Sequence, residues 1–314
     1  MKKDNFLMPA LVLGLTIGLS AALGLGAHTT AAGDREYREY KVVEKEQINK
    51  ILKFENPAKG RELEVDNIFG SIEVTGTDGQ DVELAAERTV RAKTRENLQK
   101  AKEEVSLDIS QKEGGILLYV DGPFRSDDDR ERGHRSRYFG IRRSNWRDPG
   151  YIVEYNFKLR IPQRTGVFLS TVNGGRIRVE NIEGDFEVSN VNGEIEMTRI
   201  AGSGDATTVN GGVKVMFTRN PEKACFLKTV NGRLDVFLPG DAKADFRLKT
   251  FNGEGFSDFP VTYLPGEPAE QSRQDGKFVY RRGGFQGVQV GGKGGPEIRL
   301  ETLNGDIYIN KSKV

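Results

Sequence analysis

The sequence predicts a mainly β protein in the form of a parallel β-solenoid, and three observations favour this fold. A short phrase with Gly at a corner, often preceded by Asn, recurs along the chain. The glycines from Gly174 to Gly211 are 10, 9, 9 and 9 residues apart, and the spacing then becomes 21 residues up to Gly253. Apolar and polar residues alternate after each Gly, which is typical of a strand with one buried face.

The repeated units begin at Asn67, Thr171, Asn181, Asn190, Arg199, Thr208, Thr229, Thr250 and Thr302. We expect the apolar residues two and four positions after the Gly to fill the core. We expect the apolar residue two positions before the Gly, such as Val191, Val209 or Leu303, to point inward as well, and the Gly to supply a positive φ. Gly175 is an extra residue in its unit and predicts a β-bulge. The predicted structural corners are Asn173, Gly174, Gly184, Asn192, Gly193, Asn210, Gly211, Asn231, Gly232, Asn252, Gly253, Asn304 and Gly305.

An antiparallel sandwich is the alternative fold, because Asn-Gly between alternating strands is also the usual signal for a two-residue hairpin. The strand segments are short, however, and the same inward pattern returns after every corner. A chain that turns at each Gly and stacks on its preceding unit explains this regularity better. The block from Ile161 to Ser257 would then hold about five coils.

Three parts follow one another along the chain. Residues 1–32 have the layout of a signal peptide, with Lys2 and Lys3 before an apolar run, although that run of 22 residues is also long enough to remain as a membrane anchor. Residues 33–160 form a β-rich part with a short helix at about 94–105, for which Thr94 is the N-cap candidate. Residues 161–314 form the repeat solenoid, in which a Gly-rich insertion at 260–296 precedes a capping strand.

A charged insertion at 123–149 interrupts the N-terminal part. Between Arg125 and Arg147 it has eight Arg against three Asp and one Glu, with aromatic residues between them. One interpretation is a solvated loop, and the other is a site for an anionic polymer. For the second interpretation we expect Arg142, Arg143 and Trp146 to make the contact. The Gly-rich insertion is the other loop in which a binding role remains open.

The composition argues against most forms of catalysis. One Cys and two His exclude an intramolecular disulfide and a zinc cluster. The residue after the unit Gly varies too much for a calcium-binding repeat. No paired acids or nucleophile motif recurs on one face, so we expect no catalytic residues, no metal and no cofactor. The net charge of +1 indicates no nucleic-acid partner.

Several segments resemble the putative-adhesin family of exported bacterial β-strand-repeat proteins, which is catalogued mainly as a domain of unknown function. These segments are ELEVDNIFGSIEVTGTDGQDVEL from Glu62, FKLRIPQ leading into TVNGGRIRV, VFLPGDAKADFRLKTFNGEG, and GGPEIRLETLNGDIYINKSKV at the end of the chain. The resemblance covers about residues 38–314. It implies a β-solenoid outside the cytoplasm and brings no catalytic residues.

Two functions from different classes follow from the sequence. The first is a non-catalytic, extracytoplasmic scaffold or adhesin-like protein that presents its faces to an envelope polymer or a surface protein. We expect such a protein to be periplasmic, exposed on the cell surface or secreted, or anchored if residues 1–32 are retained. The second is a carbohydrate-active enzyme, a polysaccharide lyase or hydrolase on a β-helix.

Overall fold

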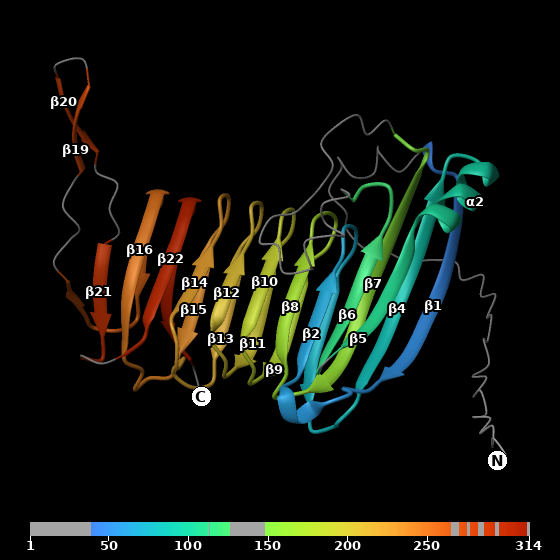
Figure 1. Cartoon of the computed structure of the whole chain (residues 1–314). Coiled ribbons are helices and arrows are strands. Elements are labelled where there is room, and N and C mark those ends of the chain that lie inside the picture. Colours follow the sequence, from blue (N-terminus) through green and yellow to red (C-terminus); the bar gives the residue numbers. More distant parts are fainter. Residues whose placement is uncertain are drawn as a thin grey trace, which may run out of the picture. The chain divides into compact units, whose positions relative to one another are not determined.

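Two large mixed β-sheets make up most of the described chain (Figure 1). The computed structural model describes residues 39–112, 114–125, 148–264, 270–274, 277–281, 286–292 and 295–312. The predicted signal or anchor at residues 1–32 therefore lies outside the described residues. Residues 40–314 form one compact unit, so the predicted N-terminal part and the repeats share the same two sheets.

The first sheet, sheet A, has ten strands. Their order across the sheet is β1 (Val42–Leu52), β4 (Val82–Ala92), β7 (Tyr151–Pro162), β3 (Ile72–Thr77), β9 (Ile177–Ile182), β11 (Ile195–Ile200), β13 (Val213–Phe217), β15 (Leu234–Leu238), β23 (Ile307–Lys311) and β17 (Gly255–Ser257). Pairing is parallel from β7 to β17, and antiparallel where β4 joins β1 and β7.

The second sheet, sheet B, has eleven strands. Their order is β18 (Val261–Tyr263), β21 (Gln286–Val290), β16 (Ala244–Asn252), β22 (Glu297–Asn304), β14 (Cys225–Lys228), β12 (Gly204–Thr207), β10 (Phe186–Asn190), β8 (Gly166–Thr171), β2 (Glu62–Asp66), β6 (Gly115–Asp121) and β5 (Ser106–Lys112). The strands from β16 to β6 pair in parallel, whereas β18, β21 and β5 pair antiparallel at the two ends. A separate hairpin joins β19 (Glu270–Gln274) and β20 (Lys277–Arg281).

Successive strands of the repeat region alternate between the two sheets. A strand of sheet B, a corner and a strand of sheet A form one unit, as in β10 and β11, and the next unit pairs with it in parallel in both sheets. In Figure 1 the corner loops that follow β8, β10, β12 and β14 gather along one edge. We call this edge the corner edge.

Two units lie out of chain order. The unit of β2 and β3 is paired between β6–β7 and β8–β9, and the unit of β22 and β23 is paired between β14–β15 and β16–β17. The last unit is therefore not a capping strand, as the sequence suggested. Instead β18 and β21 extend sheet B beyond β16, and the chain returns through residues 258–296 to insert its last unit one place inside the row.

The core consists of the inward-facing residues of both sheets. The apolar residues expected two and four positions after the corner Gly are almost fully buried, which confirms that part of the prediction: Phe186, Val188, Ile195, Met197, Val213, Val215, Leu234, Val236, Ile307 and Ile309. Parallel register places like residues of neighbouring units directly opposite each other, as with Ile177, Ile195 and Val213. Each layer of the core thus repeats the layer beside it.

The α-helix α2 (Arg95–Glu104) lies against strands β1, β4 and β7. Thr94 caps its N-terminus, because the Thr94 hydroxyl accepts a hydrogen bond from the Asn97 amide at 3.1 Å. Leu98 and Ala101 are its buried residues. At its C-terminal end the Arg88 guanidinium donates to the Val105 carbonyl oxygen at 2.9 Å. The helix therefore begins at the residue that the sequence indicated.

We expect Ile195→Ala to lower the free energy of unfolding by roughly 2–5 kcal/mol, because it leaves a cavity in a layer that cannot collapse without moving both neighbouring units. Glu187→Gln on the exposed face of β10 is the control and should change that free energy by less than about 0.5 kcal/mol. Urea denaturation measures both. Equal losses in the two variants would contradict the assignment of the core.

Candidate binding surface

Six asparagine side chains form a hydrogen-bonded row along the corner edge, which we call the asparagine row. Asn192 Nδ2 donates to Asn173 Oδ1 at 2.7 Å, and each following amide donates to the one before it at 2.6–2.9 Å. Each amide has a second N–H, which stays available to solvent or to a ligand. In spatial order the row contains Asn173, Asn192, Asn210, Asn231, Asn304 and Asn252, and all but the half-buried Asn173 are exposed.

A buried polar residue at the start of each phrase anchors the corner from inside. The Thr229 hydroxyl donates to the Gly211 carbonyl oxygen at 2.7 Å, and Thr208 donates to Gly193 at 2.9 Å. The same bond is made by Thr171, Asn190, Thr250 and Thr302. Sequence reasoning missed this role, although the recurrence of Thr three positions before the Gly was a visible signal.

The corner glycines share a close approach to the neighbouring unit, whether or not their φ is positive. A Cβ on Gly193 would lie 2.0 Å from the Gly175 carbonyl oxygen, and a Cβ on Gly232 would lie 2.0 Å from that of Gly211. The expected positive φ is present at Gly211 (φ +150°) and Gly305 (φ +153°) but not at Gly193 or Gly232, so it does not hold at every corner. Neighbouring units pack so tightly here that any side chain would push the backbones apart.

Two of the predicted corner residues do not occupy the corner edge position that the sequence indicated. Gly184 lies on the opposite edge, where sheet A strands lead into sheet B strands, and its Cβ would meet the Thr165 carbonyl oxygen at 2.2 Å. Gly174 has φ +74° and no atom near its missing Cβ. Gly175 occupies the corner position instead, so Gly174 is the inserted residue of the predicted bulge.

An apolar stripe runs beside the asparagine row. It consists of the residues two positions before the corner Gly, namely Val191, Val209, Val230, Leu303 and Phe251. The first four were expected to point inward, but Val209 is 38% exposed and Leu303 46%, and Phe251 is 78% exposed. Val191 and Val230 are half-buried, and Ile182 at the same position of the Asn181 unit is fully buried as expected. Where the Thr takes the inward position, as at Thr208 and Thr302, the alternation of strand side chains turns the next residue outward.

Charged side chains pair across the outward face of sheet A. Glu196 lies between Lys214 at 3.0 Å and Arg178 at 3.4 Å. The hydrogen bond from Lys214 and the positive charges hold the pKa of the Glu196 carboxyl below its ordinary value, against a smaller opposing effect of burial. At the far end of the same face the Tyr308 and Phe256 rings stack with centroids 4.8 Å apart.

Arg125 belongs to the folded body and not to a charged loop. Its guanidinium makes two hydrogen bonds to the Asp66 carboxylate at 3.0 and 3.1 Å, donates to the Val120 carbonyl oxygen, and lies over the Tyr119 ring at 4.4 Å. Phe124 is buried too. Phe124 and Arg125 therefore pack in the folded body, although the sequence assigned them to the charged insertion at 123–149. Arg142, Arg143 and Trp146 lie outside the described residues.

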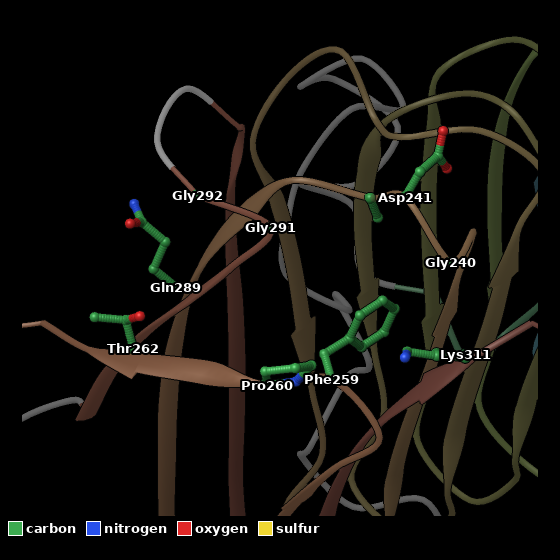
Figure 2. A pocket seen from close by; sticks show the side chains of 10 residues that line it. Gly240, Asp241, Phe259, Pro260, Thr262, Gln289, Gly291, Gly292 and Lys311 are labelled. Carbon is green, nitrogen blue, oxygen red and sulfur yellow. The ribbon is translucent and has the colours of Figure 1, made fainter.

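A shallow pocket of about 470 Å³ opens between the chain segments around Gly240, Phe259, Gly291 and Lys311. Figure 2 shows the Lys311 side chain beside the Phe259 ring, whereas Asp241 and Gln289 point away from that ring. The Lys311 ammonium lies 5.2 Å from the ring centroid. The polar groups do not converge on one point, so this pocket lacks the arrangement that a specific small-molecule site needs.

The structure describes the surroundings of the single cysteine. Cys225 is buried, and desolvation raises the pKa of its thiol to about 11, which keeps it protonated and unreactive. In the part of the chain that the structure describes, no group of three or more His, Cys, Asp or Glu could hold a metal ion. Across the same residues, no helix has the length and apolar character needed to cross a membrane.

We expect Gly232→Ala to lower the free energy of unfolding by about 3 kcal/mol or more, because its Cβ would overlap a backbone oxygen that cannot move independently. Gly240→Ala is the matched control, since no atom lies within 4 Å of its added Cβ. Thermal and urea unfolding measure both. A Gly232 variant as stable as the Gly240 variant would contradict the close-approach account.

We expect Arg125→Ala to cost roughly 3 kcal/mol of stability, because it removes one partner of a mostly buried ion pair. Arg125→Lys retains the charge and loses the paired hydrogen bonds, so its loss should be intermediate. The measurement is the urea midpoint of each variant. An Arg125→Ala midpoint equal to that of the unsubstituted protein would contradict the assignment of Arg125 to the folded body.

Comparison with known proteins gives a distant likeness to solved structures. No family model and no curated protein matches the chain. A putative cell adhesion protein from Clostridium sporogenes is similar over 86% of this chain and 100% of its own, at 12% identity and a TM-score of 0.42. A putative adhesin from Bacteroides fragilis is similar over 86% and 97%, at 9% identity and a TM-score of 0.33. A putative lipid binding protein from Parabacteroides distasonis is similar over 87% and 98%, at 11% identity and a TM-score of 0.24.

Proposed function

We propose that this protein is an exported, non-catalytic β-repeat scaffold of adhesin-like type, which binds an extended polymer of the cell envelope along its corner edge. The observation that carries the proposal is the asparagine row with the apolar stripe beside it. Val209, Leu303 and Phe251 are exposed and therefore contribute little to the core. Apolar side chains that gather on the surface mark interaction sites.

The repeat architecture supports an extended ligand. We propose that the parallel units form a β-solenoid, because their strands alternate between two sheets and each corner pairs with the next. Neighbouring strands in such an array lie about 4.8 Å apart, so equivalent groups recur at a fixed interval along the edge. A polymer with its own regular repeat can then meet amide and apolar groups in register over several units.

The chemistry of the surface suits a polysaccharide. Free amide N–H and C=O groups exchange hydrogen bonds with hydroxyl groups, and valine, leucine and phenylalanine side chains cover the apolar faces of sugar rings. The described residues that flank the basic segment lie toward the same edge, because Arg125 follows β6, which runs parallel to β2, and Asp148 precedes β7, which runs parallel to β3. This favours an acidic polymer, for which Arg142, Arg143 and Trp146 remain the proposed contacts.

Export is proposed from the composition of residues 1–32, with the periplasm, the cell surface or the medium as the destination.

The test is binding of the purified protein to a panel of neutral and acidic envelope polysaccharides, measured by calorimetry together with an assay for released sugar ends. Replacing Val209 and Leu303 with Asn should weaken binding at least about tenfold, the equivalent of roughly 1.4 kcal/mol of lost apolar contact. Glu187→Gln, on the outward face of sheet B, should bind as before. Turnover of any polymer, or equal binding by both variants, would contradict the proposal.

A further inference from the structure

The asparagine row has a direction and is open at one end. Every amide donates to the Oδ1 atom of its neighbour, and Asn252 is the last donor. No described residue donates to Asn252 Oδ1 in turn. The Gly253 carbonyl oxygen also lacks a donor among the described residues. In the preceding unit, the Thr250 hydroxyl donates to the equivalent Gly305 carbonyl oxygen. The last unit thus presents the acceptors that a further unit would use.

The backbone beside this open end is an unpaired strand edge. β17 is the outermost strand of sheet A and pairs with β23 alone. Ile307 donates to the Glu254 carbonyl oxygen and Asp258 donates to that of Ile309, both at 2.9 Å. Because parallel pairing uses alternate residues, Gly255 and Ser257 direct their N–H and C=O groups away from β23. An exposed strand edge of this kind is a template for another strand.

The outward side chains at this edge alternate acid, aromatic, acid. Glu254 and Asp258 are exposed, and the Asp258 carboxylate accepts a hydrogen bond from the Lys311 amide at 3.1 Å. Phe256 between them is 43% exposed, and Phe251 at the corner is 78% exposed. The edge therefore combines two exposed acidic side chains with exposed aromatic surface, and this combination favours a basic and apolar partner.

Two neighbouring units in the middle of sheet A already pair basic side chains with acidic ones. The β9 unit carries Arg176 and Arg178 at alternate positions after its corner, and it pairs in parallel with the acidic β11 unit. Arg176 meets Glu194 at 2.8 Å and Arg178 meets Glu196 at 3.4 Å. A strand that follows an Asn-Gly corner and carries arginines at alternate positions can therefore pair in parallel with an acidic unit of this type.

We propose that a partner polypeptide adds to β17 as a parallel strand led by an Asn-Gly corner, with basic residues at alternate positions. Its first and third basic residues would face Glu254 and Asp258, and the cation between them would lie over the Phe256 ring. Its corner would supply the amide that Asn252 Oδ1 lacks. The contact is one short strand long, so it is a transient interaction rather than an obligate one.

The probe is the labelled peptide acetyl-TVNGRIRVK-amide, added to the full-length protein and followed by fluorescence anisotropy and hydrogen exchange. We expect saturable binding, with new protection confined to residues 251–258. Two control peptides should bind at least about tenfold more weakly, one with acidic residues in place of the basic ones and one N-methylated at alternate backbone positions. The first control tests charge and the second tests strand addition.

Protein variants locate the interaction. Glu254→Lys should weaken binding of the basic peptide and strengthen binding of the acidic one, whereas Glu187→Lys on sheet B should leave both affinities unchanged. No binding at about 1 mM peptide, equal affinity for the N-methylated peptide, or protection elsewhere would overturn the proposal. Self-association of the protein that Glu254→Lys abolishes would overturn it as well, since a second copy would then occupy the edge. Polysaccharide binding at the corner edge is measured separately and does not depend on this outcome.

Discussion

The contact between corner glycines of neighbouring units is the constraint on which the rest of the fold depends. At Gly193, Gly232, Gly253 and Gly305 the carbonyl oxygen of the adjacent glycine occupies the space where a Cβ would be, at 2.0 Å. This approach lets the Thr hydroxyl of one unit reach the carbonyl oxygen of the next, and it brings successive asparagine amides within 2.6–2.9 Å. Parallel register in both sheets follows, and so does a core in which each layer repeats its neighbour.

The candidate binding surface is a consequence of the same corner. Where the Thr takes the inward position, as at Thr208 and Thr302, the residue after it faces solvent, and the Asn after that belongs to the exposed row. Within one four-residue phrase, the Thr and Gly thus stabilise the corner, and the apolar residue and the Asn form the proposed binding surface. The apolar member is free to vary, from Val209 to Leu303 to Phe251, while the Thr, Asn and Gly members are held by contacts with the neighbouring unit.

The sequence predicted the strands, the core positions and the capped helix, because each depends on local periodicity or on one capping residue. Ile195 and Met197 follow the alternation, and Thr94 precedes a run of helix formers. The sequence did not predict which unit neighbours which, since the phrases at Thr229, Thr250 and Thr302 are chemically alike and fit one another in any order. It also missed the partner of Arg125, because Asp66 lies 59 residues away in the chain and no repeat links the two.

The most direct test of this account is the order of the asparagine row, measured by disulfide cross-linking in a protein whose Cys225 has been replaced by Ala. Asn231 and Asn304 are paired across neighbouring units, whereas Asn231 and Asn252 are separated by the inserted unit. Two strand spacings amount to roughly 9.6 Å, beyond the limit of about 7 Å between Cα atoms that a disulfide spans. Asn231→Cys with Asn304→Cys should therefore cross-link under mild oxidation, and Asn231→Cys with Asn252→Cys should not. The reverse result would show that the units stack in chain order and would contradict the interlocked arrangement.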